Sequence, residues 1–300
     1  MPYKNISNTA YIIADSLAKL SYATPWKEYI SDEMRFLNKS FAHYAKRTFI
    51  KRIINLLPLP ASIFIMDTFF IPGMTYHYLF RKLLIDKQLN KSLSDGVKQV
   101  IILGAGLDTL AIRKAKEQPG INFFEIDLPG TQNAKVEILN KIEYLIPSNC
   151  IFKPADLSNT KLGTILLEDN RFNTNAPTLI ILEGVLMYLN ESEVKNLFTD
   201  LYNLIDAKLI ITFGAMTSSD CNKNWRVRII NSLLHRSNEE TKWSCSSEIM
   251  PQFMAYLGYE LQWWIPYKEI QNSYRSAETI KDLPTEDENY YSVLKMSKAA

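Results

Sequence analysis

Two glycines in the middle of the chain stand where many α/β proteins bind a nucleotide. Gly104 and Gly106 follow the apolar run at 100–103 and open a helix-forming stretch, which is where a doubly wound fold holds its nucleotide. Glycines there let the backbone approach a ligand because they carry no Cβ. The third glycine of the dinucleotide fingerprint is absent. The pair therefore predicts either a nucleotide-binding turn or a tight turn without a ligand.

An acidic residue lies at the expected distance beyond this turn. Asp127 ends the apolar run at 122–126, 21 residues after Gly106, where a carboxylate can accept both hydroxyls of a ribose. An Asp two residues before Pro129 also fits a helix cap. We expect Asp127 to bind the ribose of an adenosine-containing cofactor, with the helix cap as the alternative.

Two further runs end in residues that suit the rest of such a cofactor. Asp156 and Leu157 follow the run at 150–153 and offer an acceptor for the adenine amino group and an apolar contact for its ring. Glu183 follows five apolar residues, and burying a carboxylate there is costly unless a cation meets it. These loops suit a cofactor that is adenosine at one end and cationic at the other. S-adenosylmethionine is such a molecule.

The methionine carboxylate of this cofactor needs a positive partner. Arg81 lies on a helix predicted just before the first strand, and it is a candidate for that partner. In the run Phe80-Arg81-Lys82 it also fits a surface cation, and spacing alone favours the surface interpretation. Lys82 is expected to face solvent.

No catalytic base is assigned from the sequence. A carboxylate acceptor of a methyl group would need no general base, whereas a hydroxyl acceptor would need one. The three histidines are His43, His77 and His235, and His77 precedes Arg81 by one helical turn. Each of them also fits a packing or surface role. No pattern of metal ligands is present, so we expect no metal site.

The elements that must position these residues alternate along the chain. Short apolar runs at 99–103, 122–126, 150–153, 178–182 and 208–213 are separated by helical segments, notably 131–145 and 191–205. This alternation predicts an α/β fold with a doubly wound, mostly parallel sheet. Two late runs, 259–265 and 291–296, complete a seven-stranded sheet as an antiparallel pair at one edge, because no long helix is predicted between them.

The chain reads as a single domain over 1–300. We expect residues 1–95 to form a helical cap and lead-in helix, and 96–214 to form the cofactor-binding α/β core. We expect residues 215–246 to form a lid insertion, and 247–300 to contain a closing helix and the antiparallel strands. We expect the cap and the lid to enclose the acceptor site.

Composition excludes several classes of protein. Thirty-four basic against 32 acidic residues give a net charge of +2, far from the positive field of a nucleic-acid binder. Three widely spaced cysteines argue against a disulfide framework, so we expect a cytoplasmic protein. The first residues lack the pattern of a signal peptide. Prolines and Asp67 interrupt the apolar stretch 53–74 before it reaches the length of a membrane-spanning helix.

The motifs together resemble one family. The segments that carry the resemblance are YLFRK (78–82), QVIILGAGLDT (99–109), FEIDLP (124–129), ADL (155–157) and EGVLMYL (183–189). In this order and spacing they resemble the leucine carboxyl methyltransferase family of S-adenosylmethionine-dependent O-methyltransferases. The resemblance covers about residues 72–190. It implies a class I methyltransferase fold, and it implies cofactor contacts at Arg81, Gly104, Asp127, Asp156, Leu157 and Glu183.

The resemblance does not specify the methyl acceptor. We expect an S-adenosylmethionine-dependent methyltransferase that acts on the oxygen of a small-molecule carboxylate or hydroxyl. One alternative is an NAD(P)-dependent oxidoreductase, which would share the fold and Asp127. The missing third glycine and the Arg81 and Glu183 motif positions count against it. Another alternative is a catalytically silent module that binds the cofactor or a partner.

Overall fold

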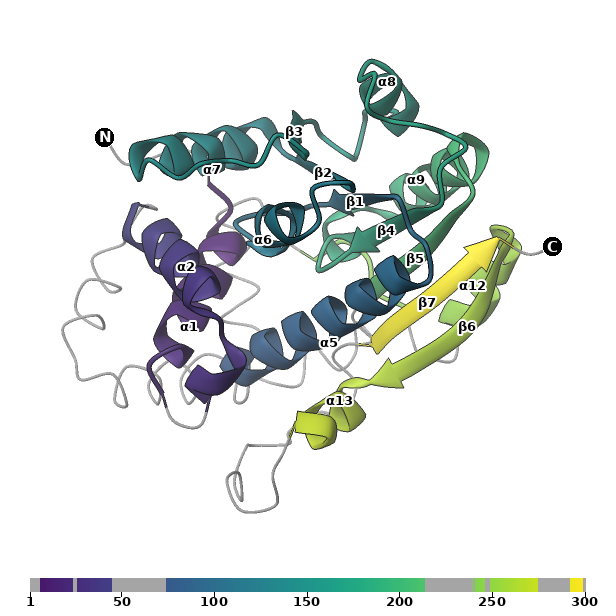
Figure 1. Ribbon diagram of the computed structural model, residues 1–300. Coiled ribbons are helices and arrows are strands. Elements are labelled where there is room, and N and C mark those ends of the chain that lie inside the picture. The colour runs from purple at the N-terminus through teal and green to yellow at the C-terminus, as the bar shows by residue number, and fades with distance from the viewer. Residues whose placement is uncertain are drawn as a thin grey trace.

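The computed structural model contains one seven-stranded sheet, and Figure 1 shows it with its helices. The structure describes residues 6–23, 26–44, 74–213, 239, 241–245, 249–274 and 292–298. The strand order is β3-β2-β1-β4-β5-β7-β6. The strands are β1 (Gln99–Leu103), β2 (Asn122–Asp127), β3 (Cys150–Pro154), β4 (Thr178–Leu182), β5 (Ala207–Phe213), β6 (Tyr259–Pro266) and β7 (Ser292–Lys298).

The two central strands are buried on both faces. In β1, Val100 and Ile102 join one hydrophobic core while Ile101 and Leu103 join the other. All five residues of β1 and all five of β4 are buried. Successive side chains of a strand point to opposite faces. A continuous apolar run is therefore what a sheet covered on both sides requires.

Helices cover both faces of this sheet. The helices are α1 (Asn8–Leu20), η1 (Trp26–Tyr29), α2 (Asp32–Tyr44), α5 (Met74–Ser94), α6 (Leu110–Glu117), α7 (Pro129–Lys141), α8 (Leu162–Leu167), η2 (Leu186–Tyr188), α9 (Glu191–Leu204), α12 (Met250–Tyr256) and α13 (Tyr267–Tyr274). Helices α1, α2, α5, α6 and α7 contribute to the core on one face, and α8, α9 and α12 to the core on the other. Figure 1 shows α1 and α2 gathered at the end of the molecule where α7 lies.

The predicted mostly parallel sheet is confirmed. Strands β1 to β5 are parallel to one another, and the two late segments pair antiparallel with each other. The expected antiparallel pair at one edge of the sheet is confirmed. β7 inserts between β5 and β6 and is antiparallel to both. The chain between β6 and β7 also begins with the short helix α13, which sequence periodicity did not predict.

Several other expectations concern residues at or beyond the limits of the described structure. The predicted lead-in helix is present as α5, and Gly96 follows it with φ +97°. The apolar stretch 53–74 lies outside the described residues apart from Met74 at the start of α5. Most of the lid insertion 215–246, with His235, lies outside them as well.

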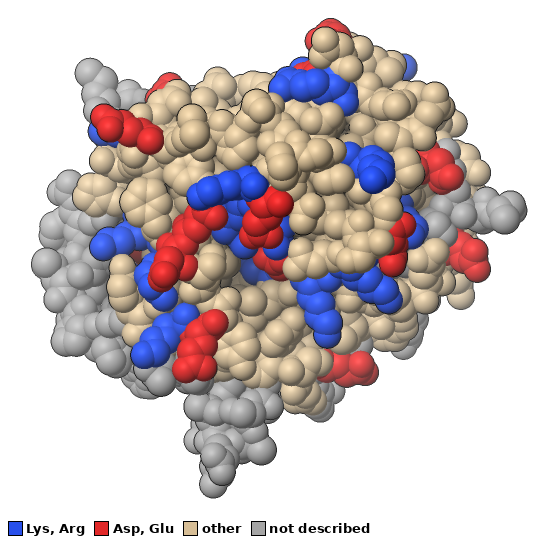
Figure 2. Space-filling model, viewed as in Figure 1, with Lys and Arg blue, Asp and Glu red and all other residues tan. Residues whose placement is uncertain are grey.

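None of the described helices is long and apolar enough to span a bilayer. Figure 2 shows acidic and basic side chains interspersed over the visible face.

Candidate active site at the carboxyl edge of the sheet

Four of the predicted site residues follow four adjacent parallel strands. Gly104 follows β1, Asp127 ends β2, Asp156 lies two residues after β3, and Glu183 directly follows β4. Because these strands are parallel and adjacent in the sheet, their carboxyl ends share one edge. In open α/β sheets this edge is where ligands bind. The fold therefore gathers residues that are 79 positions apart in the sequence.

A cluster of buried charges lies at the centre of this edge. The Nε of Arg81 donates to Oε1 of Glu183 at 2.8 Å, and the Nζ of Lys82 donates to Oε2 of the same carboxylate at 2.9 Å. Lys82 also donates to Oδ2 of Asp108 at 2.7 Å. The side chains are 3% to 10% exposed. We call Arg81, Lys82, Asp108 and Glu183 the ion-pair cluster.

Lys82 corrects an expectation from the sequence. Its neighbours in the chain predict a solvent-facing side chain, but its ammonium group is buried between two carboxylates. Burial alone lowers the pKa of Lys82, but the charges of Asp108 and Glu183 outweigh burial and raise it. Asp108 is the residue in the sequence that could have indicated this contact, because a carboxylate in the turn after a buried strand needs a cation nearby.

Asp108 is fixed by the backbone as well as by Lys82. Its Oδ1 accepts hydrogen bonds from the backbone N–H of Thr109 at 2.6 Å and of Leu110 at 3.2 Å, at the start of α6. Burial raises the pKa of the Asp108 carboxyl, but the Lys82 charge and hydrogen bond reverse this effect and hold the pKa below its usual value. The carboxylate is therefore charged when it holds Lys82.

His77 supports the cluster from the preceding turn of α5. Since a guanidinium can only donate, Nη1 of Arg81 donates to Nε2 of His77, at 3.3 Å. Burial lowers the pKa of His77 well below its usual value, and the Arg81 charge lowers it further. His77 is therefore a neutral hydrogen-bond acceptor that helps to orient Arg81. His43 is exposed at the end of α2.

The glycine turn after β1 is closely packed against the loop after β4. Gly104 has φ +67°, and a Cβ at this position would lie 2.1 Å from Cγ2 of Val185. Gly106 has φ +54°, and its Cβ would lie 3.1 Å from the Cβ of Ala10 in α1. Both positions thus favour glycine for conformation, and Gly104 also needs it for space. The amino end of α1 therefore lies at the carboxyl edge of the sheet.

Asp127 holds this turn in place. Its Oδ2 accepts from the backbone N–H of Gly106 at 2.6 Å, and its Oδ1 accepts from the N–H of Leu128 at 2.7 Å. Burial raises the pKa of Asp127, while these two hydrogen bonds oppose the rise. The side chain contacts the glycine turn, as a ribose-binding carboxylate in a nucleotide fold would. Its role toward a ribose stays a prediction.

Asp156 and Leu157 lie at the far side of the same edge. Asp156 Oδ1 accepts from both the N–H and the hydroxyl of Ser158, at 2.9 and 2.7 Å. Leu157 is half-buried and packs against the core that contains α8 and α9. The strand order places these residues at β3, on the side of the sheet away from β4 and Glu183. The carboxyl edge therefore has the ion-pair cluster at its centre, with the polar Asp156 and the apolar Leu157 at one side.

A second contact links the amino end of α1 to the loops of this edge. The carboxylate of Glu239 accepts from the backbone N–H of Asn8 at 2.6 Å, from the N–H of Thr9 at 3.0 Å and from the Thr9 hydroxyl at 2.8 Å. The hydroxyl of Tyr188 donates to Oγ1 of Thr9 at 3.0 Å. Nothing in the sequence indicates Glu239, because it lies 230 residues from Thr9.

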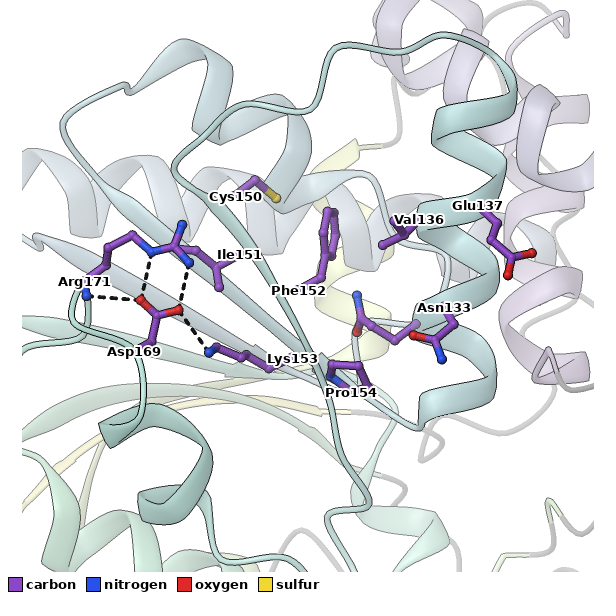
Figure 3. A pocket seen from close by; sticks show the side chains of 11 residues that line it. Asn133, Val136, Glu137, Cys150, Ile151, Phe152, Lys153, Pro154, Asp169 and Arg171 are labelled. Carbon is purple, nitrogen blue, oxygen red and sulfur yellow. Dashed lines mark hydrogen bonds and ion pairs between the residues drawn. The ribbon is translucent and has the colours of Figure 1, made fainter.

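A cavity of about 480 Å³ lies elsewhere, between α7 and β3. Figure 3 shows the guanidinium of Arg171 donating two hydrogen bonds to the carboxylate of Asp169, which also forms an ion pair with Lys153. None of the residues that line the cavity belongs to the ion-pair cluster. We place the candidate active site at the carboxyl edge, because the charged groups there are buried and converge on one point. Among the described residues, no group of three metal-ligating side chains is suited to hold a metal ion.

Comparison with known proteins assigns the family. A family model described as leucine carboxyl methyltransferase matches residues 18–202, which is more than half of the chain. The chain belongs to the leucine carboxyl methyltransferase family. The matched residues include α5, β1 to β4 and therefore the whole ion-pair cluster. The family predicted from the motifs is thus confirmed.

Individual relatives agree with this assignment. YktD of Bacillus subtilis (strain 168), provisionally named an S-adenosyl-L-methionine-dependent methyltransferase, is 33% identical over 135 residues, or 45% of this chain and 44% of YktD. A Frankia alni protein with the same provisional name, FRAAL3718, is 31% identical over 120 residues, or 40% of this chain and 41% of its own length. The match thus spans less than half the length of these relatives. The predicted cofactor, S-adenosylmethionine, is confirmed at the level of the family.

A solved structure supports the fold. The crystal structure of a protein from Thermobifida fusca YX, provisionally described as a methyltransferase, has a TM-score of 0.58 at 16% identity. The match covers 88% of this chain and 94% of that chain. The predicted fold class is confirmed. The individual roles of Arg81, Gly104, Asp127, Asp156, Leu157 and Glu183 toward the cofactor stay predictions.

Proposed function

We propose that this chain is an S-adenosylmethionine-dependent methyltransferase that methylates an oxygen of a small molecule. The observation that carries the proposal is the buried contact of 2.8 Å between Arg81 and Glu183. The amino-acid end of S-adenosylmethionine is a zwitterion, which needs one fixed cation and one fixed anion close together. Arg81 would hold the carboxylate and Glu183 would face the ammonium group.

The remaining edge residues suit the other parts of the cofactor. Asp127, at the end of β2, would accept the ribose hydroxyls. Asp156 and Leu157 would contact the amino group and the ring of adenine. Gly104 and Gly106 keep the turn beside the ligand free of side chains. This donor set fits S-adenosylmethionine, which supplies an activated methyl group on a sulfonium when it is bound.

The protein would contribute positioning and exclusion of water. Methyl transfer to oxygen is an in-line displacement, so alignment of the acceptor is a large part of the rate enhancement. A carboxylate acceptor needs no proton transfer. A hydroxyl acceptor needs a base, and the neutral His77 already accepts a hydrogen bond from Arg81. With His77 held in this way, we propose an acceptor that is ionised before it binds, such as a carboxylate or an acidic phenol.

The test is transfer of a labelled methyl group. The full chain is incubated with methyl-labelled S-adenosylmethionine and a panel of carboxylic acids and phenols, with Glu183→Gln as the impaired variant and Lys87→Gln, an exposed position on α5, as the matched control. We expect label in at least one acceptor for the wild type and the control. A parallel incubation replaces S-adenosylmethionine by NAD(P)H, and oxidation of NAD(P)H there with no methyl transfer in the first would favour an oxidoreductase. Binding of cofactor without any transfer would indicate a silent module.

A further inference from the structure

Lys82 joins three separate elements of the active-site edge. It lies on α5, and its ammonium group contacts Glu183 in the loop after β4 and Asp108 in the loop after β1, at 2.9 and 2.7 Å. The side chain is 10% exposed. The two carboxylates together fix the position of the Lys82 ammonium group. Removing one partner of a buried ion pair leaves an uncompensated charge, so the loss of Lys82 would be costly.

The two oxygens of Glu183 have different partners. Oε1 accepts from Arg81 and Oε2 accepts from Lys82. In the proposed function Arg81 binds the ligand carboxylate, and the ligand ammonium group approaches Glu183. Oε1 can then exchange Arg81 for the ammonium group while Oε2 stays on Lys82. Lys82 is itself anchored by Asp108, whose other oxygen is held by the backbone of α6.

We infer that Lys82 is a positioning residue that holds Glu183 by Oε2, so that Oε1 is presented to the α-ammonium group of the cofactor. The inference rests on the proposed function and deepens it. If the inference is right, replacing Lys82 weakens the binding only of ligands that have an amino-acid end. A ligand that shares the adenosine and thioether but lacks the amino acid makes no use of Oε1. A residue with a merely structural role would affect both kinds of ligand alike.

The experiment is calorimetric titration with two ligands. S-adenosylhomocysteine carries the α-ammonium group, whereas 5′-methylthioadenosine lacks the whole amino acid. Lys82→Gln should weaken binding of S-adenosylhomocysteine roughly ten- to a hundredfold, as expected for a charged hydrogen bond. Binding of 5′-methylthioadenosine should change by less than about threefold. Lys82→Arg should restore part of the lost affinity because it keeps the charge, and Lys87→Gln should change neither titration.

The outcomes separate the inference from the function on which it rests. If the wild type binds neither ligand, the proposed function fails. If the wild type binds both and Lys82→Gln weakens both equally, or leaves S-adenosylhomocysteine unaffected, the inference is overturned. If Lys82→Gln does not fold, the double variant Lys82→Gln/Asp108→Asn removes the unpaired carboxylate as well. The same selective loss is expected for it, and a loss equal for both ligands would again overturn the inference.

Discussion

Replacing Gly104 by Ala should disturb the turn that the candidate site is built on. A residue with a Cβ at φ +67° is strained by roughly 1–2 kcal/mol. The new Cβ would also lie 2.1 Å from Cγ2 of Val185, with the Cβ and Cγ1 of Val185 at 3.3 and 3.4 Å. Rotation of this stiff side chain offers little relief, and overpacking costs roughly 1–3 kcal/mol more. We expect Gly104→Ala to lower the free energy of unfolding by about 2–5 kcal/mol.

Two other glycines separate strain from the clash. Gly96 has φ +97°, but a Cβ added there would have no atom within 4 Å, so Gly96→Ala should show the strain alone. Gly120 has neither feature, and Gly120→Ala should be neutral or slightly stabilising. Urea unfolding of the three variants gives the comparison. Equal losses for Gly104→Ala and Gly96→Ala would refute the close approach of Val185 to the turn.

Three further predictions concern buried ionisable groups. Arg81→Ala should weaken S-adenosylhomocysteine binding by roughly ten- to more than a hundredfold in calorimetry, with Arg81→Lys intermediate; unchanged affinity would contradict the site. Because burial and then Arg81 lower the pKa of His77 in the folded state, stability is lost as pH falls below 6.5, and His77→Gln should reduce the loss between about pH 7.5 and 5.5 by up to about 1.4 kcal/mol. An unchanged difference in urea unfolding at the two pH values would reject this. Lys135 and Glu125 form a fully buried pair at 2.5 Å, so Lys135→Met should cost about 3–5 kcal/mol, and Lys135→Met/Glu125→Leu less; equal thermal shifts would contradict this.

The strands and the chain order of the edge residues follow directly from the sequence. Continuous apolar runs such as 178–182 must be buried on both faces, and this requires helices on both sides of a parallel sheet. The carboxyl ends then meet at one edge whatever the details of the loops. For this reason the sequence alone is enough to place Asp127 and Glu183 at the same edge of the sheet.

Contacts between distant segments could not be predicted in the same way. Lys82 follows Arg81 on the helix, so periodicity places the two side chains on different faces, yet both donate to Glu183. The insertion of β7 between β5 and β6 depends on long-range pairing that local patterns do not encode. Glu239 contacts α1 through three hydrogen bonds. The next residue in the chain is also a glutamate, so no local signal sets Glu239 apart.

The most direct test of the central claim is calorimetric titration of the wild-type chain with S-adenosylhomocysteine and, separately, with NAD⁺. The ion-pair cluster suits an amino-acid zwitterion, and the turn after β1 lacks the third glycine of a dinucleotide site. We therefore expect saturable binding of S-adenosylhomocysteine and no binding of NAD⁺. Binding of NAD⁺ with no heat from S-adenosylhomocysteine would contradict the account.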